Sequence, residues 1–203
     1  MKVQVLEKND IEIKFVVQEL TDAFANEFRR IIMSEVPTMA IEWIDFKKND
    51  SVMNDEILAN RLGQVPLTFD QKIYDLPEDC KCEGKGCSRC QVELILKKKG
   101  PGMVYSGDLK TKAKDVKPVF DNIPIAELFE GEEMQFEAIA QLGKGRMHAK
   151  WQASVVGYKQ EKNDFIFTVE SVCGLPAEDV VSTAAEVFER KINDFNKNFG
   201  KLK

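Results

Sequence analysis

The chain contains 203 residues, of which 43% are hydrophobic and 31% charged, and its formal net charge is −5. Such a chain can bury a normal core in one large domain or two modest ones. The acidic balance argues against a large direct contact with nucleic-acid phosphates, which basic surfaces bind. Because the sequence starts directly with strand-like alternation and has no apolar run of membrane-spanning length, we expect a cytoplasmic protein without membrane contact.

The first elements are predicted from alternation and helical spacing. Alternating apolar residues predict a β-hairpin over residues 2–18 with its turn at Lys8-Asn9. Thr21 suits the N-cap of a helix, and apolar residues at helical spacing continue until Pro37 ends it. One apolar stripe of this helix comprises Phe24, Phe28, Ile31 and Ile32.

The middle of the chain is predicted as several short elements. They are, in order, a strand over 39–46, a short helix from Asn54 to Gly63, strands over 91–97 and 103–109, and a helical turn or two over 124–130 closed by Gly131. Residues 134–142 are mixed and apolar and give no clear assignment.

The last part combines a strand over 165–173 with a long helix after Pro176, for which Gly200 stands where a C-terminal cap is expected. Apolar residues fall on one broad helical face, namely Val180, Ala184, Val187, Phe188, Ile192, Phe195 and Phe199. This stripe is wider than one thin sheet buries easily. Ordinary core packing and burial against a partner explain it equally well.

Four of the five cysteines lie within eleven residues, in a Cys-x-Cys-x4-Cys-x2-Cys pattern formed by Cys80, Cys82, Cys87 and Cys90. Thiolates are good ligands for a tetrahedral metal, and small residues such as Gly84 and Gly86 permit the turns that converge on it. Lys81, Lys85 and Arg89 would offset the negative charge of a four-thiolate centre.

Two small disulfides or free thiols on a loop are the alternative interpretation of this cluster. A metal is favoured because the chain has no export signal, and disulfides are rare in reducing compartments. Zinc is favoured over iron–sulfur because the pattern is typical of a closed structural site. The sequence therefore predicts one structural zinc ion held by the four cysteines.

Several catalytic patterns are absent from the sequence. It contains no Gly-rich phosphate loop, no Gly-x-Ser-x-Gly elbow, no His-Glu-x-x-His and no aspartate triplet for two-metal chemistry. The single histidine, His148, has no evident nucleophile partner. We therefore expect no catalytic residues in this chain.

Five stretches, in order along the chain, resemble one family, the alpha-type subunits of DNA-directed RNA polymerase. They are Asn26–Ile41, Asp55–Leu67, Val104–Leu109, Gly143–Trp151 and the tail from Phe165 to Phe199. The cysteine loop favours the archaeal and eukaryotic branch of the family. The short length favours its archaeal members, the counterparts of the third-largest subunit of eukaryotic polymerase II.

The resemblance implies a two-domain α+β subunit. A discontinuous dimerisation domain would comprise residues 1–46 plus 152–203, and residues 47–151 would form an inserted, mostly-β domain carrying the metal loop. Some archaeal members resemble ferredoxins in an additional cysteine-rich domain. Here the stretch between Trp151 and Phe165 contains no cysteine, so no iron–sulfur cluster is expected.

The resemblance also implies partners. The chain would form a heterodimer with the alpha-like subunit L and serve as the platform for the large catalytic subunits, joined by small subunits N and P, with little or no direct nucleic-acid contact. The apolar stripes predict the heterodimer interface as Phe24, Phe28, Ile31, Ile32, Val180, Ala184, Val187, Phe188, Ile192 and Phe195.

Arg29 and Arg30 are the expected docking residues for the second-largest catalytic subunit. Adjacent arginines on a helix point about 100° apart, so both cannot face one partner. They could simply be solvated charges, but the apolar neighbours suggest that one borders an interface, where guanidinium groups suit carboxylates and carbonyls. We assign this role to Arg30.

Two other functions compete with the assembly platform. The cysteine cluster alone suggests a zinc-dependent nucleic-acid-binding module, against which stand the acidic charge and the lack of a recognition helix beside the cluster. A stand-alone enzyme has no catalytic constellation to support it.

Overall fold

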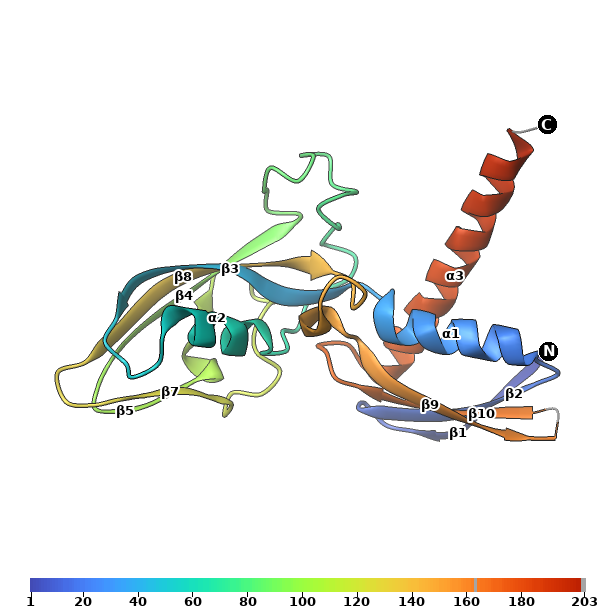
Figure 1. The fold of residues 1–203 in the computed structure, drawn as a ribbon, viewed down its shortest axis with the longest axis horizontal. Coiled ribbons are helices and arrows are strands. Elements are labelled where there is room, and N and C mark those ends of the chain that lie inside the picture. The colour runs from blue at the N-terminus through green and yellow to red at the C-terminus, as the bar shows by residue number, and fades with distance from the viewer. Residues whose placement is uncertain (163, 202–203) are drawn as a thin grey trace. The chain divides into compact units, whose positions relative to one another are not determined.

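The computed structural model describes residues 1–162 and 164–201 and divides into two compact units (Figure 1). Unit 1 comprises Met1–Pro37 and Lys144–Lys203, and unit 2 comprises the intervening Thr38–Gly143. The first unit is therefore built from both ends of the chain. No helix among the described residues combines the length and apolarity needed to cross a membrane.

Unit 1 is an antiparallel four-stranded sheet with two helices on one face. The strand order is β1-β2-β10-β9. The elements are β1 (Lys2–Lys8), β2 (Glu12–Gln18), α1 (Asp22–Ser34), the 3-10 turn η2 (Ala149–Trp151), β9 (Ser154–Glu161), β10 (Asp164–Ser171) and α3 (Ala177–Gly200).

The core of unit 1 follows from strict alternation in its two central strands. On β2 every second residue is buried, and β10 repeats this pattern with Phe165, Phe167 and Val169. Successive side chains of a strand point to opposite faces, so these apolar rows meet the helices together. Phe15 stacks on Phe167 across the β2–β10 pair with ring centroids 5.3 Å apart.

The predicted start of α1 is confirmed. The hydroxyl oxygen of Thr21 accepts a hydrogen bond from the amide of Phe24 at 3.3 Å, which satisfies one of the free donors at the helix start. The helix ends at Ser34, three residues before Pro37. Its buried residues are Ala25, Phe28, Ile31 and Ile32, all on one face.

The C-terminal helix differs from the prediction at its end. α3 continues through Gly200, and the C-cap residue is Lys201 in the right-handed helical region. Gly200 is thus an ordinary helical residue here. A glycine permits a left-handed cap but does not require one, so the sequence signal was wrong at this position.

Unit 2 contains a second antiparallel sheet, a helix and a separate strand pair. The sheet order is β3-β8-β4-β6, and β5 pairs with β7. The elements are β3 (Thr38–Asn49), α2 (Asp55–Gly63), β4 (Gln91–Lys99), β5 (Gly102–Tyr105), the 3-10 turn η1 (Ser106–Asp108), β6 (Lys110–Thr111), β7 (Pro124–Leu128) and β8 (Glu133–Gly143).

Helix α2 lies between the sheet and the β5–β7 pair (Figure 1). The side chains that fill this space include Leu58 and Leu62 of the helix and Phe136 of β8, all fully buried. Because these apolar side chains pack together within Thr38–Gly143, unit 2 has its own core, while Ile57 and Asn60 of α2 stay exposed.

Residues 124–130 were predicted as a helical turn, and the structure shows a strand instead. β7 pairs with β5 in the register Ala126↔Val104 and Leu128↔Gly102. Ile125 and Leu128 enter the core. The short apolar run fits a helix or a strand equally well, and the partner strand decides between them.

The predicted strand over 103–109 is also corrected, because β5 ends at Tyr105. A carboxylate oxygen of Asp108 accepts a hydrogen bond from the Tyr105 amide at 2.8 Å and another from the Lys98 ammonium at 2.5 Å. These bonds close the 3-10 turn η1.

The strand β9, which was not predicted, pairs with β10 from Ser154 to Glu161.

Candidate metal centre and apolar groove

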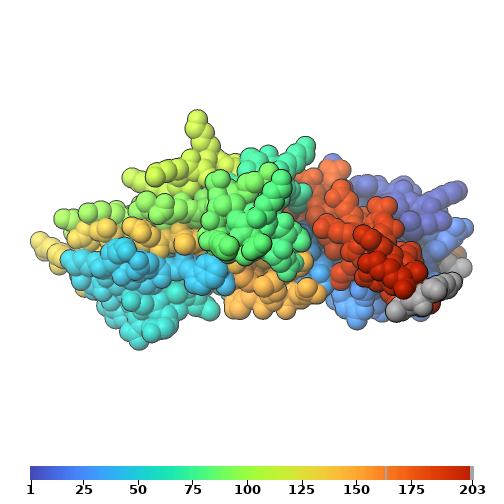
Figure 2. Space-filling view, turned by 90° about the horizontal axis from the view of Figure 1, so that it is seen from above, coloured from blue at the N-terminus to red at the C-terminus, as the bar shows by residue number. Residues whose placement is uncertain are grey.

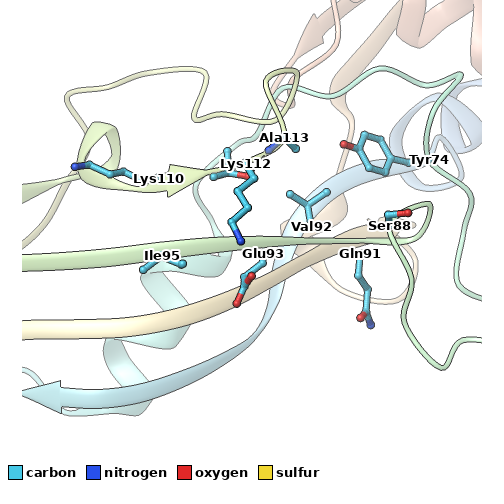
Figure 3. Close-up of a pocket in the computed structure, with 10 residues that line it drawn as sticks. Tyr74, Ser88, Gln91, Val92, Glu93, Ile95, Lys110, Lys112 and Ala113 are labelled. Atoms are coloured by element: carbon cyan, nitrogen blue, oxygen red, sulfur yellow. Dashed lines mark hydrogen bonds between the residues drawn. The ribbon is translucent and has the colours of Figure 1, made fainter.

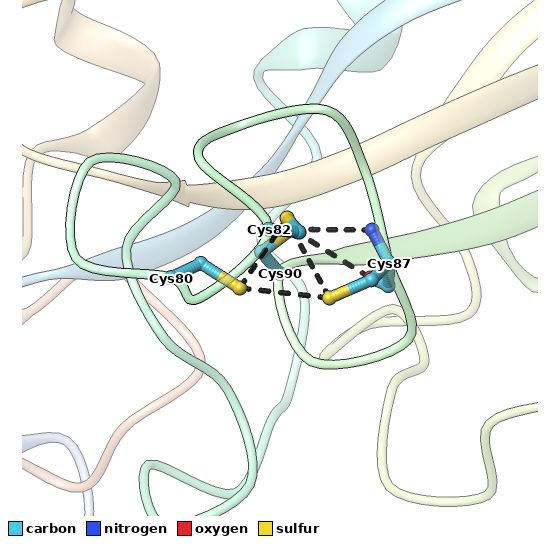
Figure 4. Close-up of side chains that lie close together, drawn as sticks. All are labelled: Cys80, Cys82, Cys87 and Cys90. Carbon is cyan, nitrogen blue, oxygen red and sulfur yellow. Dashed lines mark hydrogen bonds between the residues drawn. The ribbon is translucent and has the colours of Figure 1, made fainter.

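The four clustered cysteines converge at one point in unit 2, on the loop between α2 and β4 (Figure 4). The Sγ atoms of Cys80 and Cys87 lie 3.5 Å apart, as do those of Cys82 and Cys90. The Cys82–Cys80 and Cys87–Cys90 pairs are 3.5 and 3.8 Å apart. All four sulfur atoms lie within 4.8 Å of one another.

This spacing fits four ligands of one tetrahedral ion. Zinc–sulfur bonds of about 2.3 Å place the ligand sulfurs of a tetrahedral site about 3.8 Å apart. A disulfide would require about 2.05 Å, and all five cysteines of the chain are free. The four thiols can therefore hold a metal ion as they stand.

The loop backbone makes this convergence possible through left-handed turns. Glu83, Gly84 and Gly86 have φ angles of 55°, 74° and 92°. A side chain at Gly86 would also collide with the Gln91 side-chain amide, which lies against the position of a Cβ. The amide of Cys87 donates to Cys90 Sγ at 3.3 Å, a bond that stabilises a thiolate.

The thiols differ in acidity. Hydrogen bonding with Cys80, together with further bonds in the loop, lowers the pKa of Cys82 to about 6. Burial raises the pKa of the Cys90 thiol to about 12. Without a metal the cluster therefore keeps protons at neutral pH that a bound cation would displace.

Two of the basic residues between the cysteines, Arg89 and Lys85, have carboxylate partners of their own. Arg89 forms a two-point pair with Asp75, with Nε–Oδ2 3.0 Å and Nη2–Oδ1 3.4 Å. Asp75 also donates its amide to the Arg89 carbonyl at 2.8 Å. Lys85 pairs with Glu83 at 3.8 Å. Asp75 is a loop-holding residue that the sequence did not identify, since nothing in the pattern distinguishes one surface aspartate.

Unit 1 carries an apolar groove of about 460 Å³ between β1, β2 and the two helices. Phe24 and Phe188 form its aromatic floor, with ring centroids 5.0 Å apart, and Phe28 lies beside both. The other lining residues are mostly apolar and include Met1, Val3, Val5, Val181, Ala185 and Ile192.

The predicted interface residues fall into two sets. Six are buried in unit 1, namely Phe28, Ile31, Ile32, Val180, Ala184 and Val187, and of these only Phe28 also lines the groove. Phe24 and Phe188 are half-buried in the groove, while Ile192 and Phe195 are 47% and 66% exposed. A side chain without exposed surface cannot contact a partner, so the surface available for pairing is smaller than the stripes suggest.

The C-terminal half of α3 extends away from the unit 1 sheet (Figure 1). It lies at the molecular surface, as the red spheres in Figure 2 show. Every residue from Lys191 to Gly200 is exposed. Phe195 and Phe199 stack on each other there with centroids 5.9 Å apart.

The two arginines of α1 have different surroundings. Arg29 is half-buried and its guanidinium contacts the Met33 sulfur at 3.4 Å. Arg30 is exposed and pairs with Glu27 one turn earlier. The structure thus points the two guanidinium groups to different neighbours, as the 100° rotation requires.

Two roles within unit 1 were not identified from the sequence, although the strand β1 itself was predicted as part of the hairpin over residues 2–18. β1 adds Val3 and Val5 to the groove, although all its residues are exposed. Glu35, whose side chain is 12% exposed, pairs with Lys191 at 3.0 Å and Arg146 at 3.6 Å, and so ties α3 to the end of α1. The apolar residues Val3 and Val5 on an exposed strand were a usable signal for the groove. No pattern in the sequence distinguishes Glu35 from other surface glutamates.

Residues 44–168, more than half of the chain, match the family described as the RNA polymerase Rpb3/RpoA insert domain. The chain is also similar to proteins named DNA-directed RNA polymerase subunit Rpo3. It is 32% identical to that of Archaeoglobus fulgidus over 255 aligned positions, which cover 97% of each chain. It is 35% identical to that of Pyrococcus furiosus over 262 positions, which cover 100% of this chain and 98% of the relative.

Some relatives match over less of their length. The identity is 50% over 155 residues to the protein of Methanothermobacter thermautotrophicus, covering 75% of this chain and 58% of the relative. For Methanosphaera stadtmanae the covered share of the relative is 61%. The chain therefore spans about three fifths of these relatives. The 255-position alignment exceeds the 203 residues of this chain, so that relative carries residues that this chain lacks.

Proposed function

Because the chain belongs to the Rpb3/RpoA family of RNA polymerase subunits, we propose that it is a non-catalytic assembly platform of a DNA-directed RNA polymerase. In this role it pairs with the alpha-like subunit L and then docks the large catalytic subunits. The observation that carries the proposal is the apolar groove of unit 1, together with the exposed aromatic residues that continue from it along α3.

The groove suits a helix from subunit L. Burying a large apolar side chain contributes roughly 1.5–3 kcal/mol, so a few aromatic anchors suffice for a stable pair. The discontinuous dimerisation domain that we propose, residues 1–46 plus 152–203, contains all the groove residues, and the inserted domain, residues 47–151, contains the cysteine cluster.

Phe188→Asp tests this assignment. The change places a charge on the groove floor, where no Lys or Arg lies among the lining residues, so we expect pairing with subunit L to weaken at least a hundredfold. The measurement is size-exclusion chromatography with light scattering on co-expressed subunits. Ile57→Asp, at an exposed apolar residue of α2, is the matched control and should pair normally. Equal pairing of both variants would refute the groove as the interface.

For the cysteine cluster we propose one structural zinc ion held by Cys80, Cys82, Cys87 and Cys90. The near-tetrahedral sulfur spacing and the closed loop support this choice. Bound zinc would supply a fixed crosslink, while the chain supplies the left-handed turns and the Asp75–Arg89 pair that hold the loop.

We further propose Arg30 as the residue that docks the second-largest catalytic subunit, whereas Arg29 contacts the Met33 sulfur. Arg30 is exposed, and the only partner of its guanidinium among the described residues is Glu27, a surface pair that a competing carboxylate could replace at little cost. Small subunits N and P complete the proposed assembly, which would act in the cytoplasm.

The test of the whole proposal is the native mass of the complex that contains this chain. We expect large polymerase subunits to co-purify, and the isolated chain to polymerise no nucleotides. Recovery with nucleic acid alone would instead support the zinc-dependent nucleic-acid-binding module.

A further inference from the structure

Strand β4 has one edge that is only partly covered. β8 pairs with all nine residues of β4, whereas β6 pairs only with Leu94 and Ile95 on the other side. Thr111 ends this second pairing, because its Oγ1 accepts the Ala113 amide at 3.1 Å and turns the chain away. Among residues 1–162 and 164–201, no strand covers the outer edge of Gln91–Glu93.

A cavity of about 390 Å³ lies along this edge (Figure 3). The buried Val92 lines it from one side of β4, while Glu93 and Ile95 point to the other side. Because side chains from both faces of one strand line it, the cavity follows the strand edge and not one face of the sheet. The opposite wall is formed by Tyr74, Ser88 and Lys110–Ala113.

The Gln91 amide already donates to the Cys87 carbonyl at 2.9 Å, so the groups of this edge that are available for pairing are the remaining ones of Gln91–Glu93. The N–H and C=O groups of successive residues alternate between the two edges of a strand, so at least one residue of Gln91–Glu93 faces the cavity with both groups. An exposed edge of this kind is a template for a strand from another chain. The space is therefore suited to an extended peptide that continues the sheet where β6 leaves it.

The charges beside the cavity indicate the composition of such a peptide. Residues 110–117 contain four lysines and one aspartate, in a chain whose net charge is −5. Two lysines, Lys110 and Lys112, and one acidic residue, Glu93, line the cavity, and neither lysine has a carboxylate within 4.0 Å among the described residues. Val92 and Ala113 offer apolar contact on the other side, beside Tyr74, whose pKa burial raises to about 12 and which therefore stays neutral.

We propose that this edge, which we call the β4 edge and define as Gln91–Glu93 with Lys110–Ala113, binds an extended segment of a partner protein as an added strand. The segment alternates apolar and acidic side chains, the apolar ones beside Val92 and the acidic ones beside Lys112. The site lies wholly in unit 2 and goes beyond the assembly role, since it needs neither the groove nor subunit L.

The probe is a fluorescein-labelled octapeptide of alternating valine and glutamate, titrated with the full chain and followed by fluorescence anisotropy. We expect saturable binding, with hydrogen exchange slowed at Gln91–Glu93. Lys112→Glu should weaken binding at least tenfold. Lys114→Glu changes the same charge on the same segment at an exposed residue that does not line the cavity, and it should weaken binding less than threefold.

A second probe separates strand addition from simple charge attraction. Two variants of the octapeptide are N-methylated at alternate residues, one variant along one edge of the extended peptide and the other along the opposite edge. Each variant keeps the charge of the parent peptide but loses the backbone N–H donors of one edge. One of the two methylated peptides should bind at least tenfold more weakly than the parent. Equal affinity of all three peptides, or no binding at 1 mM, overturns the proposal.

A twelve-residue oligothymidylate tests the nucleic-acid alternative. Tighter binding of the oligonucleotide than of the peptide, weakened equally by Lys112→Glu and Lys114→Glu, would show a nonspecific basic surface and refute the β4 edge as a peptide site. The groove variant Phe188→Asp should bind the octapeptide normally, and Lys112→Glu should pair normally with subunit L. Failure of this inference and failure of the proposed function are thus distinguishable.

Discussion

At the scale of single residues, the Cys90 thiol is fully buried and lies within 3.5–3.8 Å of two other cysteine sulfurs. Water cannot easily take the place of a buried sulfur ligand. Metal binding at this site therefore depends on all four sulfur atoms. This dependence separates the cluster from Cys173, which lies outside it in unit 1.

Cys90→Ser should therefore remove stoichiometric zinc. A serine hydroxyl does not ionise at neutral pH and is a poor zinc ligand, so the remaining three thiols form an incomplete site. Elemental analysis of protein purified without chelators measures the outcome. Cys173→Ser is the control and should keep one zinc per chain. A Cys90→Ser variant that retains one tightly held zinc would contradict the assignment.

Zinc binding should also strengthen as the pH rises from 6 to 8. The pKa of Cys90 is raised to about 12, so its thiol carries a proton at neutral pH that zinc must displace. The pKa of Cys80 is raised as well, and lowering the pH through the depressed pKa of Cys82, about 6, adds a further proton to be displaced. Calorimetric titrations in two buffers of different ionisation enthalpy count the released protons. A pH-independent affinity with no proton release would be incompatible with four thiolate ligands.

At the scale of elements, α1 serves both the core of unit 1 and its groove. Ile31 and Ile32 are buried, whereas Phe24 is half-buried in the groove floor. Phe28 belongs to both, because it is 8% exposed and its ring centroid lies 6.0 Å from that of Phe167 and 6.5 Å from that of Phe188. One helix thus links the stability of the unit to the shape of its groove.

Phe28→Ala should lower the free energy of unfolding of unit 1 by roughly 3–5 kcal/mol, the usual cost of emptying a buried aromatic site. The two tryptophans lie in different units, Trp43 in unit 2 and Trp151 in unit 1. Urea unfolding followed by Trp151 fluorescence in a Trp43→Phe background therefore reports on unit 1 alone. Phe199→Ala, at an exposed position, is the control and should cost less than about 0.5 kcal/mol. A small effect of Phe28→Ala would place this ring outside the core.

At the scale of the whole molecule, the proposed contacts use separate surfaces. The groove and Arg30 belong to unit 1, and the cysteine cluster and the β4 edge belong to unit 2. Contacts that share no residues should respond independently to substitution.

Arg30→Ala should leave the heterodimer with subunit L intact and weaken recruitment of the second-largest catalytic subunit. The expected loss is about 2–5 kcal/mol if Arg30 becomes buried and paired in that contact. Reconstitution from purified subunits measures both steps. Glu27→Ala removes the present partner of Arg30 and is the matched control, because it should leave recruitment unchanged or stronger. Normal recruitment with Arg30→Ala, or loss of the heterodimer itself, would show that the role is wrongly assigned.

The sequence by itself determined the features that depend on local chemistry. Thr21 as an N-cap, the alternation in β2 and β10, and the Asn54–Gly63 helix all follow from short-range preferences, and the structure confirms them within a few residues. Four cysteines in eleven residues likewise needed no tertiary information, because a short loop can reach only a small volume. The five family stretches also identified the family without tertiary information, because their order along the chain is a property of the sequence alone.

Only the tertiary structure decided the features that depend on distant partners. Residues 124–128 form a strand because β5 lies beside them, and this pairing decides between two local conformations that the short apolar run fits equally well. The same holds for the interface stripes, where helical spacing marks Ile31 and Val180 as apolar but cannot tell core from groove. The open edge of β4 depends on where β6 turns away, and strand pairing between distant segments is set by the packed fold and not by either segment alone.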